Sequence, residues 1–214
     1  MTTTASPYIP ALSFRWLTPL YDPLLKWGMR EALFKRRLIQ RAQVRPGESV
    51  LDLGCGTGTL TLMLKQAVPA ARVMGLDGDP KTLSIARRKS ARLRLPIQWD
   101  LGMAYDLPYP DGSFDVVVSS LVIHHLASRD KLRTFCEVLR VLRPGGRLHI
   151  ADFGRPIDAL TRLQAMIMGS LEHAGDNFGG RIVPMLLQAG FSSVTEAAPV
   201  RTIFGPIWCF SGLR

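Results

Sequence analysis

The stretch that most constrains this chain is a glycine-rich junction at residues 50–58, which reads VLDLGCGTG. A short apolar run ends at Leu53, glycines follow at positions 54, 56 and 58, and a helix-like run begins at Thr59. Glycine allows positive φ and lets a ligand approach without a Cβ in the way. The start of the following helix offers unpaired N–H groups and the positive end of a dipole. The junction therefore predicts a strand–turn–helix unit that can hold a flat, partly anionic ligand.

The spacing of the glycines separates this turn from two common nucleotide motifs. A dinucleotide fingerprint needs G-x-G-x-x-G, but here the third glycine comes one residue early and Thr59 stands in its place. An ATP-binding P-loop needs a lysine after its last glycine, and none follows Gly58. The run instead resembles the first motif of the class I methyltransferases, which bind S-adenosylmethionine; a plain tight turn is the alternative. The resemblance implies a cofactor-binding role for Asp52, Gly54, Cys55, Gly56, Thr57 and Gly58.

An acidic residue follows the next predicted strand at the position that a ribose requires. Residues 72–76 read RVMGL, and Asp77 comes next, 19 residues after the last glycine of the turn. In βαβ nucleotide folds, an acidic residue about 20 residues past the glycine turn accepts hydrogen bonds from ribose hydroxyls. Asp79 directly precedes Pro80 and fits the N-cap of the next helix. Asp77, with Gly78 beside it, is therefore the candidate for ribose binding, and an exposed helix cap is its alternative.

The wider pattern alternates strands with helices. β-rich apolar runs lie at about 49–53, 72–76, 96–99, 114–119 and 146–152, and helical runs lie near 22–43, 59–67, 80–92 and 128–141. Two more helical stretches, 157–172 and 180–189, precede β-rich stretches at 192–198 and 206–213. The alternation predicts an α/β fold, with a parallel sheet that carries helices on both faces.

Length and composition narrow the class further. A chain of 214 residues has the length of one ordinary domain. No apolar run reaches the roughly 18 residues of a membrane helix, and the N-terminal MTTTASPYIP does not read as a signal peptide. The cysteines Cys55, Cys136 and Cys209 are scattered and form no C-x-x-C pair, which argues against a zinc site and against a disulfide framework. We expect a cytoplasmic protein without a bound metal.

The formal net charge of +10 is concentrated in two clusters, at 26–45 and 87–94. Each cluster could be a solvated helix face, and attraction to phosphate, in RNA or in anionic lipid, is the alternative. In the first cluster the cations alternate with aromatic and aliphatic side chains, as in helices that lie on membrane surfaces. Peripheral contact with an anionic membrane through 26–45 is therefore one hypothesis, and cover over the cofactor cleft is the other.

Further motifs follow the glycine turn in order: LPYPDGSFDVVVSS at 107–120, HHL at 124–126, VLRPGG at 141–146 and LLQAGF at 186–191. Over nearly the whole chain this order resembles the class I methyltransferase fold, and most closely the branch that contains the ubiquinone and menaquinone C-methyltransferases. The resemblance implies a Rossmann-like, doubly wound sheet of seven mostly parallel strands, the last antiparallel. It also implies a single methyltransferase domain made of N-terminal cap helices (1–45), a cofactor-binding core (46–152), substrate lid helices (153–190) and C-terminal strands (191–214).

One position departs from that branch. Its members usually carry an acidic residue that receives the adenine amino group, and this chain has Met103 there. We expect the backbone of Met103 and Ala104 to hold the adenine, with the Met103 side chain packed on the ring. Asp100 and Asp106, three residues away on either side, are the alternatives.

Candidate catalytic residues follow the fourth predicted strand. That strand ends at Ser119 and Ser120, which are expected to contact the cofactor, and His124 and His125 come shortly after. A histidine titrates near neutral pH, so it suits a general base that takes a proton from a hydroxyl or an acidic carbon. The alternative is that the histidines only pack against the next loop. Tyr21, in a YD pair, resembles a residue with which this branch caps its cofactor, and is the third candidate.

The sequence thus predicts a methyltransferase that uses S-adenosylmethionine and releases S-adenosylhomocysteine. The expected acceptor is small and apolar or aromatic, of a quinol-like or lipid-like kind, and the methyl group is transferred in line. The alternatives are an RNA ribose or ring methyltransferase and a non-catalytic cofactor-binding partner subunit. Enzymes that methylate base amino groups carry Asp/Asn-Pro-Pro-Tyr/Phe after strand four, and this chain reads SSLV there, so nucleic acid is the less favoured substrate.

Overall fold

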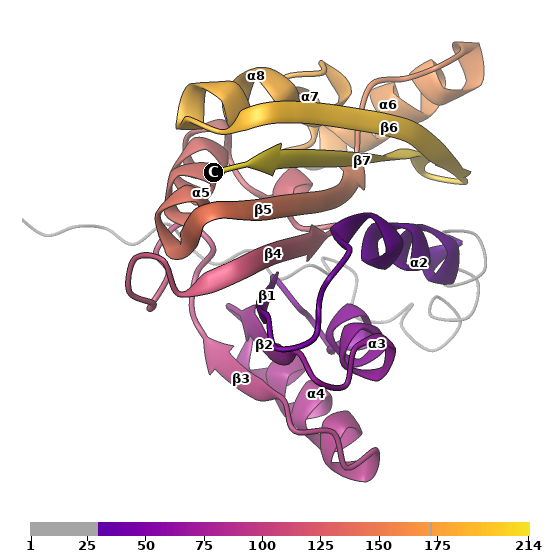
Figure 1. Cartoon of the computed structure of the whole chain (residues 1–214). Coiled ribbons are helices and arrows are strands. Elements are labelled where there is room, and N and C mark those ends of the chain that lie inside the picture. Colours follow the sequence, from indigo (N-terminus) through magenta and orange to yellow (C-terminus); the bar gives the residue numbers. More distant parts are fainter. Residues whose placement is uncertain (1–29, 172) are drawn as a thin grey trace, which may run out of the picture.

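The computed structural model describes residues 30–171 and 173–214, so Tyr21 and the rest of residues 1–29 lie outside the described part of the chain. Its centre is a sheet of seven strands in the order β3-β2-β1-β4-β5-β7-β6 (Figure 1). The strands are β1 (Ser49–Leu53), β2 (Arg72–Asp77), β3 (Gln98–Leu101), β4 (Phe114–Ser120), β5 (Leu142–Phe153), β6 (Ser192–Thr202) and β7 (Gly205–Leu213).

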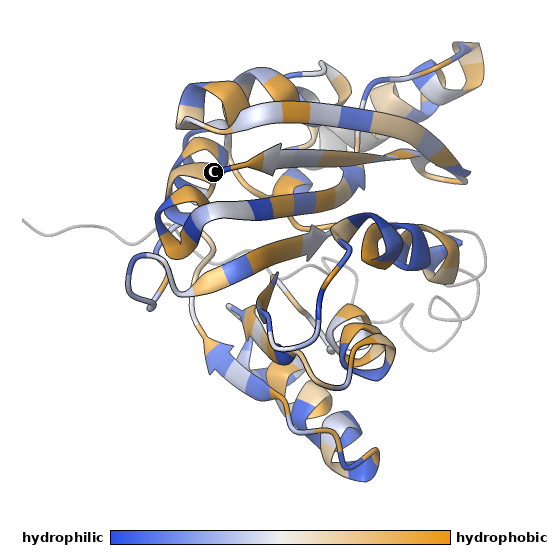
Figure 2. Ribbon diagram, in the orientation of Figure 1, coloured by the Kyte–Doolittle hydropathy of each residue, from blue (hydrophilic) through white to orange (hydrophobic). Residues whose placement is uncertain are grey.

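The pairing of the strands confirms the predicted topology. Strands β1 to β5 pair in parallel, and β7 runs antiparallel to both of its neighbours, β5 and β6. All of β1 and most of β4 are buried, as expected for central strands that are covered on both faces. Figure 2 shows the same feature, because the ribbon of β4 is orange over most of its length.

Helices cover both faces of this sheet. On one face α2 (Glu31–Ala42) and α3 (Thr59–Ala67) share an apolar core with the strands, and α4 (Pro80–Arg92) packs on β2 and β3. On the other face α5 (Ser128–Val141) and α8 (Ile182–Ala189) build a second core. The predicted doubly wound α/β class is therefore confirmed.

The structure differs from the sequence prediction in a few local features. Strand β3 lies two residues later than predicted, and two short helices, η1 (Ile123–His125) and α7 (Gly175–Phe178), were not foreseen. The PGG stretch at 144–146, predicted as a turn, lies within β5. Phe114 of β4 pairs with Leu142, but Val116, only two residues later, pairs with Arg147, five residues further along β5. The stretch is thus a bulge in a continuing strand, and the positive φ of Gly145 fits that geometry.

Four parallel strands deliver their last residues to one edge of the sheet. There β1 continues into the glycine turn, and β2 ends with Asp77. Strand β4 continues into η1, and β5 is followed by α6 (Ala159–Leu171). In open α/β sheets ligands bind at this carboxyl edge. The residues singled out by the sequence motifs are therefore gathered on the side of the sheet where a site is expected.

Candidate functional site

The three glycines of the turn do different work. A Cβ on Gly54 would lie 2.4 Å from the Val122 side chain, and one on Gly58 would lie 2.5 Å from the Trp99 ring, so close packing excludes larger residues at both positions. Gly56 also has positive φ, +54°, but no atom lies within 4 Å of the place where its Cβ would stand. The space beside Gly56 is open, which is what close approach of a ligand to the backbone requires.

Asp77 lies directly against this open glycine. The Gly56 N–H donates to Asp77 Oδ2 at 2.7 Å, and the Asp79 N–H and the Thr82 hydroxyl donate to Oδ1 at 2.9 and 3.3 Å. Asp79 caps α4 by accepting the Lys81 N–H at 2.7 Å, so the predicted N-cap is confirmed. Asp77 remains half-buried, and a carboxylate has about four acceptor sites. About one acceptor site of the Asp77 carboxylate, on Oδ2, is therefore left for a further donor.

The side chains of Asp52 and Cys55, in the same motif, are buried beneath the turn. Asp52 is fully buried and accepts the Thr61 hydroxyl at 2.6 Å; burial raises the pKa of Asp52 to about 6, against the effect of that hydrogen bond. The Cys55 side chain packs beside Trp99 in a small apolar cluster, and burial raises the pKa of its thiol. These side chains face the protein interior, so the turn presents its backbone to a ligand.

The hydroxyl of Thr57 is held by a residue that the sequence prediction missed. Lys89 of α4 donates from Nζ to the Thr57 hydroxyl at 2.9 Å and to its carbonyl oxygen at 3.1 Å. Lys89 belongs to the second basic cluster, which the sequence could not separate from a solvated helix face. One cation of that cluster therefore anchors the outer part of the glycine turn.

The wall predicted for adenine is attached to the same strand as Asp77. The Gly102 N–H donates to the Asp77 carbonyl oxygen at 3.1 Å, and Met103 pairs with Asp106 in an isolated bridge. Met103 is half-buried and Ala104 is buried. The Asp100 carboxylate accepts the Tyr109 hydroxyl at 2.9 Å. Asp100 thus already has a protein partner, and the predicted contact of Met103 with adenine stays a prediction.

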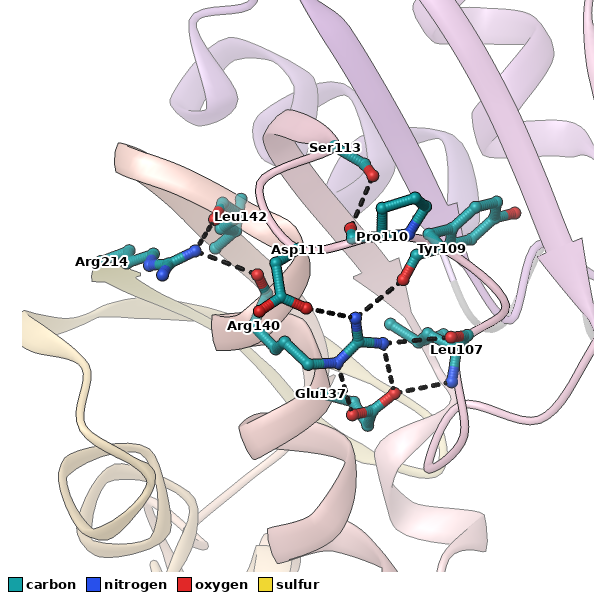
Figure 3. A network of polar contacts seen from close by, with 9 residues as sticks. All are labelled: Leu107, Tyr109, Pro110, Asp111, Ser113, Glu137, Arg140, Leu142 and Arg214. Atoms are coloured by element: carbon teal, nitrogen blue, oxygen red, sulfur yellow. Dashed lines mark hydrogen bonds and ion pairs between the residues drawn. The ribbon is translucent and has the colours of Figure 1, made fainter.

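The loop that continues this wall is fastened to α5 mainly by Arg140 and Glu137 (Figure 3). Arg140 forms two contacts of 2.8 Å with the Glu137 carboxylate and one of 2.8 Å with Asp111. It also donates to the carbonyl oxygens of Tyr109 and Leu107. The hydrogen bonds from Arg140 hold the pKa of Glu137 below its usual value, despite partial burial. The LPYPDG loop is thereby fixed in place next to Met103.

Beyond β4 the chain bends sharply before it presents the two histidines. Leu121 takes a positive φ of 58°, which is uncommon for a branched residue and marks local strain. The strain sits directly before η1, which carries His124 and His125. The rings of the two histidines lie 4.0 Å apart between centroids. The turn therefore places both histidines after the carboxyl end of β4.

His124 forms a buried pair with Asp152, the last polar residue of β5. Nδ1 of His124 lies 2.7 Å from Asp152 Oδ1, and Asp152 also accepts the N–H groups of Val122, Ile123 and Phe153. Burial tends to raise the pKa of Asp152, but His124 and the backbone donors outweigh it, so the pKa lies below its usual value. An ionised Asp152 fixes the orientation and the tautomer of the His124 ring.

A second buried ion pair, also missed from the sequence, joins α5 to α7. Lys131 is fully buried and donates to the His173 carbonyl oxygen at 2.7 Å; its Nζ lies 3.4 Å from Asp176 Oδ2. Asp176 further accepts the Ser128 hydroxyl at 2.5 Å and Arg181 at 3.0 Å. Because α7 also packs against η1, these contacts tie the segment after β5 to the histidine turn.

The remaining predicted residues have distinct positions. Ser119 is fully buried, and its hydroxyl donates to the Leu53 carbonyl oxygen at 2.9 Å, so it joins β4 to β1. Ser120 and Gly78 are half-buried at the carboxyl edge. His125 is half-buried as well, whereas His124 is buried. Tyr21 is outside the described residues, so its predicted role stays a prediction.

Comparison with known proteins identifies the class. A family model described as a methyltransferase domain matches residues 50–146. The demethylmenaquinone methyltransferase of Lactobacillus johnsonii is 31% identical over 207 residues, which cover 85% of this chain and 84% of that protein. The chain therefore belongs to the class I S-adenosylmethionine-dependent methyltransferases, in the branch of quinone biosynthesis.

Other matches agree in fold but differ in extent. The 2-phytyl-1,4-naphtoquinone methyltransferase of Synechococcus elongatus is 35% identical over 155 residues, which cover 70% of this chain. The chain spans 51–65% of the length of the first three curated relatives that it matches. The solved structure of the methyltransferase SibL has a TM-score of 0.70 at 24% identity, over 92% of this chain and 60% of that one, and at this identity it supports the fold alone.

No helix in residues 30–171 or 173–214 is long and apolar enough to cross a membrane. The same residues contain no group of three or more acidic, histidine or cysteine side chains that could hold a metal ion.

Proposed function

We propose that this chain transfers a methyl group from S-adenosylmethionine to a small apolar or aromatic acceptor with a quinol-like ring. The observation that carries the proposal is the open space beside Gly56, with Asp77 hydrogen-bonded to the same glycine. That arrangement fits a ribose and its attached groups. The reported relatives are named for demethylmenaquinone and for a phytyl-naphthoquinone, which favours a quinone-like acceptor over RNA and over a non-catalytic role.

The proposal also assigns a role to each segment of the chain. Residues 46–152 would hold the cofactor: the turn and Asp77 bind the ribose side, Met103 and Ala104 cover the adenine, and Ser120 lies at the end of β4 facing the same edge. Residues 1–45 and 153–190 would cover the acceptor. Residues 191–214 complete the sheet behind it.

When bound, S-adenosylmethionine supplies an electrophilic methyl group, which an acceptor atom displaces in line. The protein mainly has to hold the acceptor in the reactive geometry, and such orientation contributes on the order of 7–11 kcal/mol. The carboxyl-edge turns that carry Gly56 and the histidines are both rigidly fixed, through Asp77 and Asp152 respectively. Fixed walls on two sides of the site suit a reaction that depends on alignment.

A proton acceptor is also needed when the acceptor atom is a hydroxyl or an acidic carbon. His124 is oriented by the buried Asp152 carboxylate, which stabilises a protonated imidazole. His125 lies beside it with its ring partly exposed. We assign the base to this histidine pair, with Asp152 as the positioning residue behind His124.

The described part of the basic segment 26–45 supports only half of the membrane hypothesis. Phe34 and Leu38 of α2 are fully buried in the core beneath the helix. The cations Arg36, Arg37 and Arg41 are exposed. Any peripheral contact with an anionic membrane through this face would therefore rest on charge and not on inserted side chains. The expected cytoplasmic location belongs to this proposal.

A methyl-transfer assay tests the function. The full chain, methyl-labelled S-adenosylmethionine and a short-tailed demethylnaphthoquinol should yield an acceptor heavier by one methyl group. The His124→Ala, His125→Ala double variant should turn over about 10²- to 10⁴-fold more slowly, and the wild-type rate should fall at low pH as imidazole becomes protonated.

Arg72→Ala is the control, because Arg72 is exposed at the start of β2, at the opposite end of that strand from Asp77. It should keep the wild-type rate. Full activity of the double variant would remove the histidines from the mechanism, and the absence of any methylated acceptor across a set of quinols would contradict the proposed acceptor class.

A further inference from the structure

Within the described part of the chain, helix α6 exposes most of its apolar side to solvent. Four large apolar side chains on one side of the helix are each more than half exposed, and we call them the α6 stripe: Leu160, Leu163, Met166 and Ile167. The opposite side, with Thr161 and Ala165, is the buried one. A surface helix normally buries its apolar stripe and exposes its polar face. The orientation of α6 is therefore inverted with respect to its own sequence.

Polar contacts on the other side of the helix hold this orientation. Asp158 caps α6 by accepting the Thr161 N–H at 2.8 Å, and it forms an ion pair with Arg201 of β6. Gln164 donates from Nε2 to the Ile203 carbonyl oxygen at 2.9 Å. With its start and its middle tied to the last hairpin, the helix cannot easily rotate to bury the stripe.

The stripe lies at the same edge of the molecule as the proposed acceptor site. Helix α6 follows β5 at the carboxyl edge and projects beyond the sheet in Figure 1. Ile203, at the turn between β6 and β7, is also more than half exposed and adjoins α6. Phe204 of the same turn packs against the core beneath α2. The turn thus connects the α6 stripe with the helix that carries the exposed cations.

We propose that the α6 stripe, with Ile203, docks on the surface of an anionic lipid bilayer. A projecting helix is a convex ridge, which a fluid bilayer accommodates without a shaped groove. Arg162 is exposed beside the stripe, and the chain carries a net charge of +10. Apolar insertion beside cations is the combination that binds interfacial helices to anionic lipid. The proposal rests on the proposed function, because an acceptor with a long apolar chain would be drawn from the bilayer.

Vesicle sedimentation provides the first test. The full chain is mixed with vesicles of equal parts phosphatidylglycerol and phosphatidylcholine, without cofactor or acceptor. The Leu160→Gln, Leu163→Gln double variant should partition at least about tenfold more weakly than the wild type, because two apolar side chains no longer leave water. Both substitutions are neutral, so the electrostatic attraction is unchanged.

The matched control is the Leu93→Gln, Leu187→Gln double variant, whose leucines are similarly exposed but lie at the end of α4 and on α8. It should bind like the wild type. Equal losses in both variants, or none in the stripe variant, would overturn the proposal. Because no turnover is measured, failure here is distinct from failure of the proposed function, which the soluble quinol assay decides.

An environment-sensitive fluorophore decides what covers the stripe. The probe is attached to Met166→Cys in a Cys136→Ser background, because Cys136 is exposed whereas Cys55 and Cys209 are buried. Emission typical of water without vesicles, shifted to shorter wavelength by anionic vesicles, is the expected result. Emission that is already short-wavelength in the vesicle-free protein would show that the chain or a second copy covers the stripe, and would overturn the proposal. So would emission unchanged by vesicles.

Discussion

The part of the protein around the glycine turn differs from the part after residue 128 in how completely its buried polar atoms are paired. Around the glycine turn, buried polar groups have partners within the protein, such as Asp52 with Thr61 and the Trp99 indole N–H with Ser90. After residue 128 the described part of the chain keeps four buried side-chain atoms without a hydrogen-bond partner, on Thr134, His149, Gln164 and Asn177. The same part also exposes the α6 stripe.

This contrast separates what a cofactor requires from what an acceptor requires. S-adenosylmethionine is the same molecule in every member of the family, so the turn that receives it can be complete before binding. The acceptor half has to adapt to a particular molecule and to whatever surface delivers it. Unpaired polar atoms and outward apolar side chains are tolerated where binding completes the structure.

The largest expected effect is on cofactor binding at the glycine turn. Gly56 and Gly47 both have positive φ, and at both the space that a Cβ would occupy is open. Replacing either by alanine should cost about 1–2 kcal/mol of stability, because the left-handed conformation is strained for a residue with a Cβ. Only Gly56→Ala should weaken binding of S-adenosylhomocysteine, by about 10- to 100-fold, because its methyl group occupies the ligand's approach.

Calorimetric titration of the two variants, with thermal unfolding measured in parallel, checks this prediction. Gly47→Ala serves as the control for backbone strain, since Gly47 lies in the turn before β1, away from the carboxyl edge. Equal affinities in the two variants would mean that the open space at Gly56 does not face the cofactor.

The second prediction concerns His149, in the part of the protein after residue 128. Burial lowers the pKa of His149 to about 4, with Arg147 and Arg41 acting in the same direction. The unfolded chain, with an ordinary histidine near 6.5, binds a proton more readily, so stability falls as the pH drops from about 6.5 toward 4. At pH 4.5 the loss due to His149 should be about 2–3 kcal/mol.

Denaturant unfolding of the wild type and of His149→Phe, at pH 7.5 and 4.5, measures this contribution. The variant should lose less stability than the wild type over that interval. Asp52 acts in the opposite direction, because its raised pKa makes the folded state bind protons more tightly below pH 6, and it is unchanged in both proteins. His173→Gln, an exposed histidine, should behave like the wild type; equal pH dependence in all three would contradict the prediction.

The sequence predicts best those elements that have a local signal of their own. The bounds predicted for β1 and for helices α3, α4 and α5 agree with the structure. Each of these elements has a clear local signal, such as the glycine turn or the Asp79-Pro80 cap. Asp77 could be singled out as a candidate because its distance from the turn is set by one βαβ unit.

The parts that were missed depend on contacts between distant segments. Asp152 pairs with His124 across 28 positions, and Lys131 with Asp176 across 45. The rule that acidic residues at strand ends face the site could have singled out Asp152, since it sits where β5 ends. Nothing local indicates that Lys131 is buried, because a lysine in the first turn of a helix is ordinarily solvated.

The inverted orientation of α6 could not be predicted either. Its apolar periodicity fits burial against the sheet as well as exposure, and only the polar contacts of Asp158 and Gln164 decide between them. A hydrophobic pattern indicates which side of a helix is apolar. It does not indicate whether that side packs against the protein or lies on its surface.

The functional assignment depends above all on the glycine turn and Asp77 binding S-adenosylmethionine together. The decisive measurement is calorimetry of the full chain with S-adenosylhomocysteine and with NAD, repeated on Asp77→Ala. We expect one S-adenosylhomocysteine bound per chain and no measurable heat with NAD. We also expect affinity about 10- to 100-fold weaker in the variant, because charge-assisted hydrogen bonds to the ribose are lost. Tighter binding of NAD than of S-adenosylhomocysteine, or unchanged affinity in Asp77→Ala, would contradict the assignment.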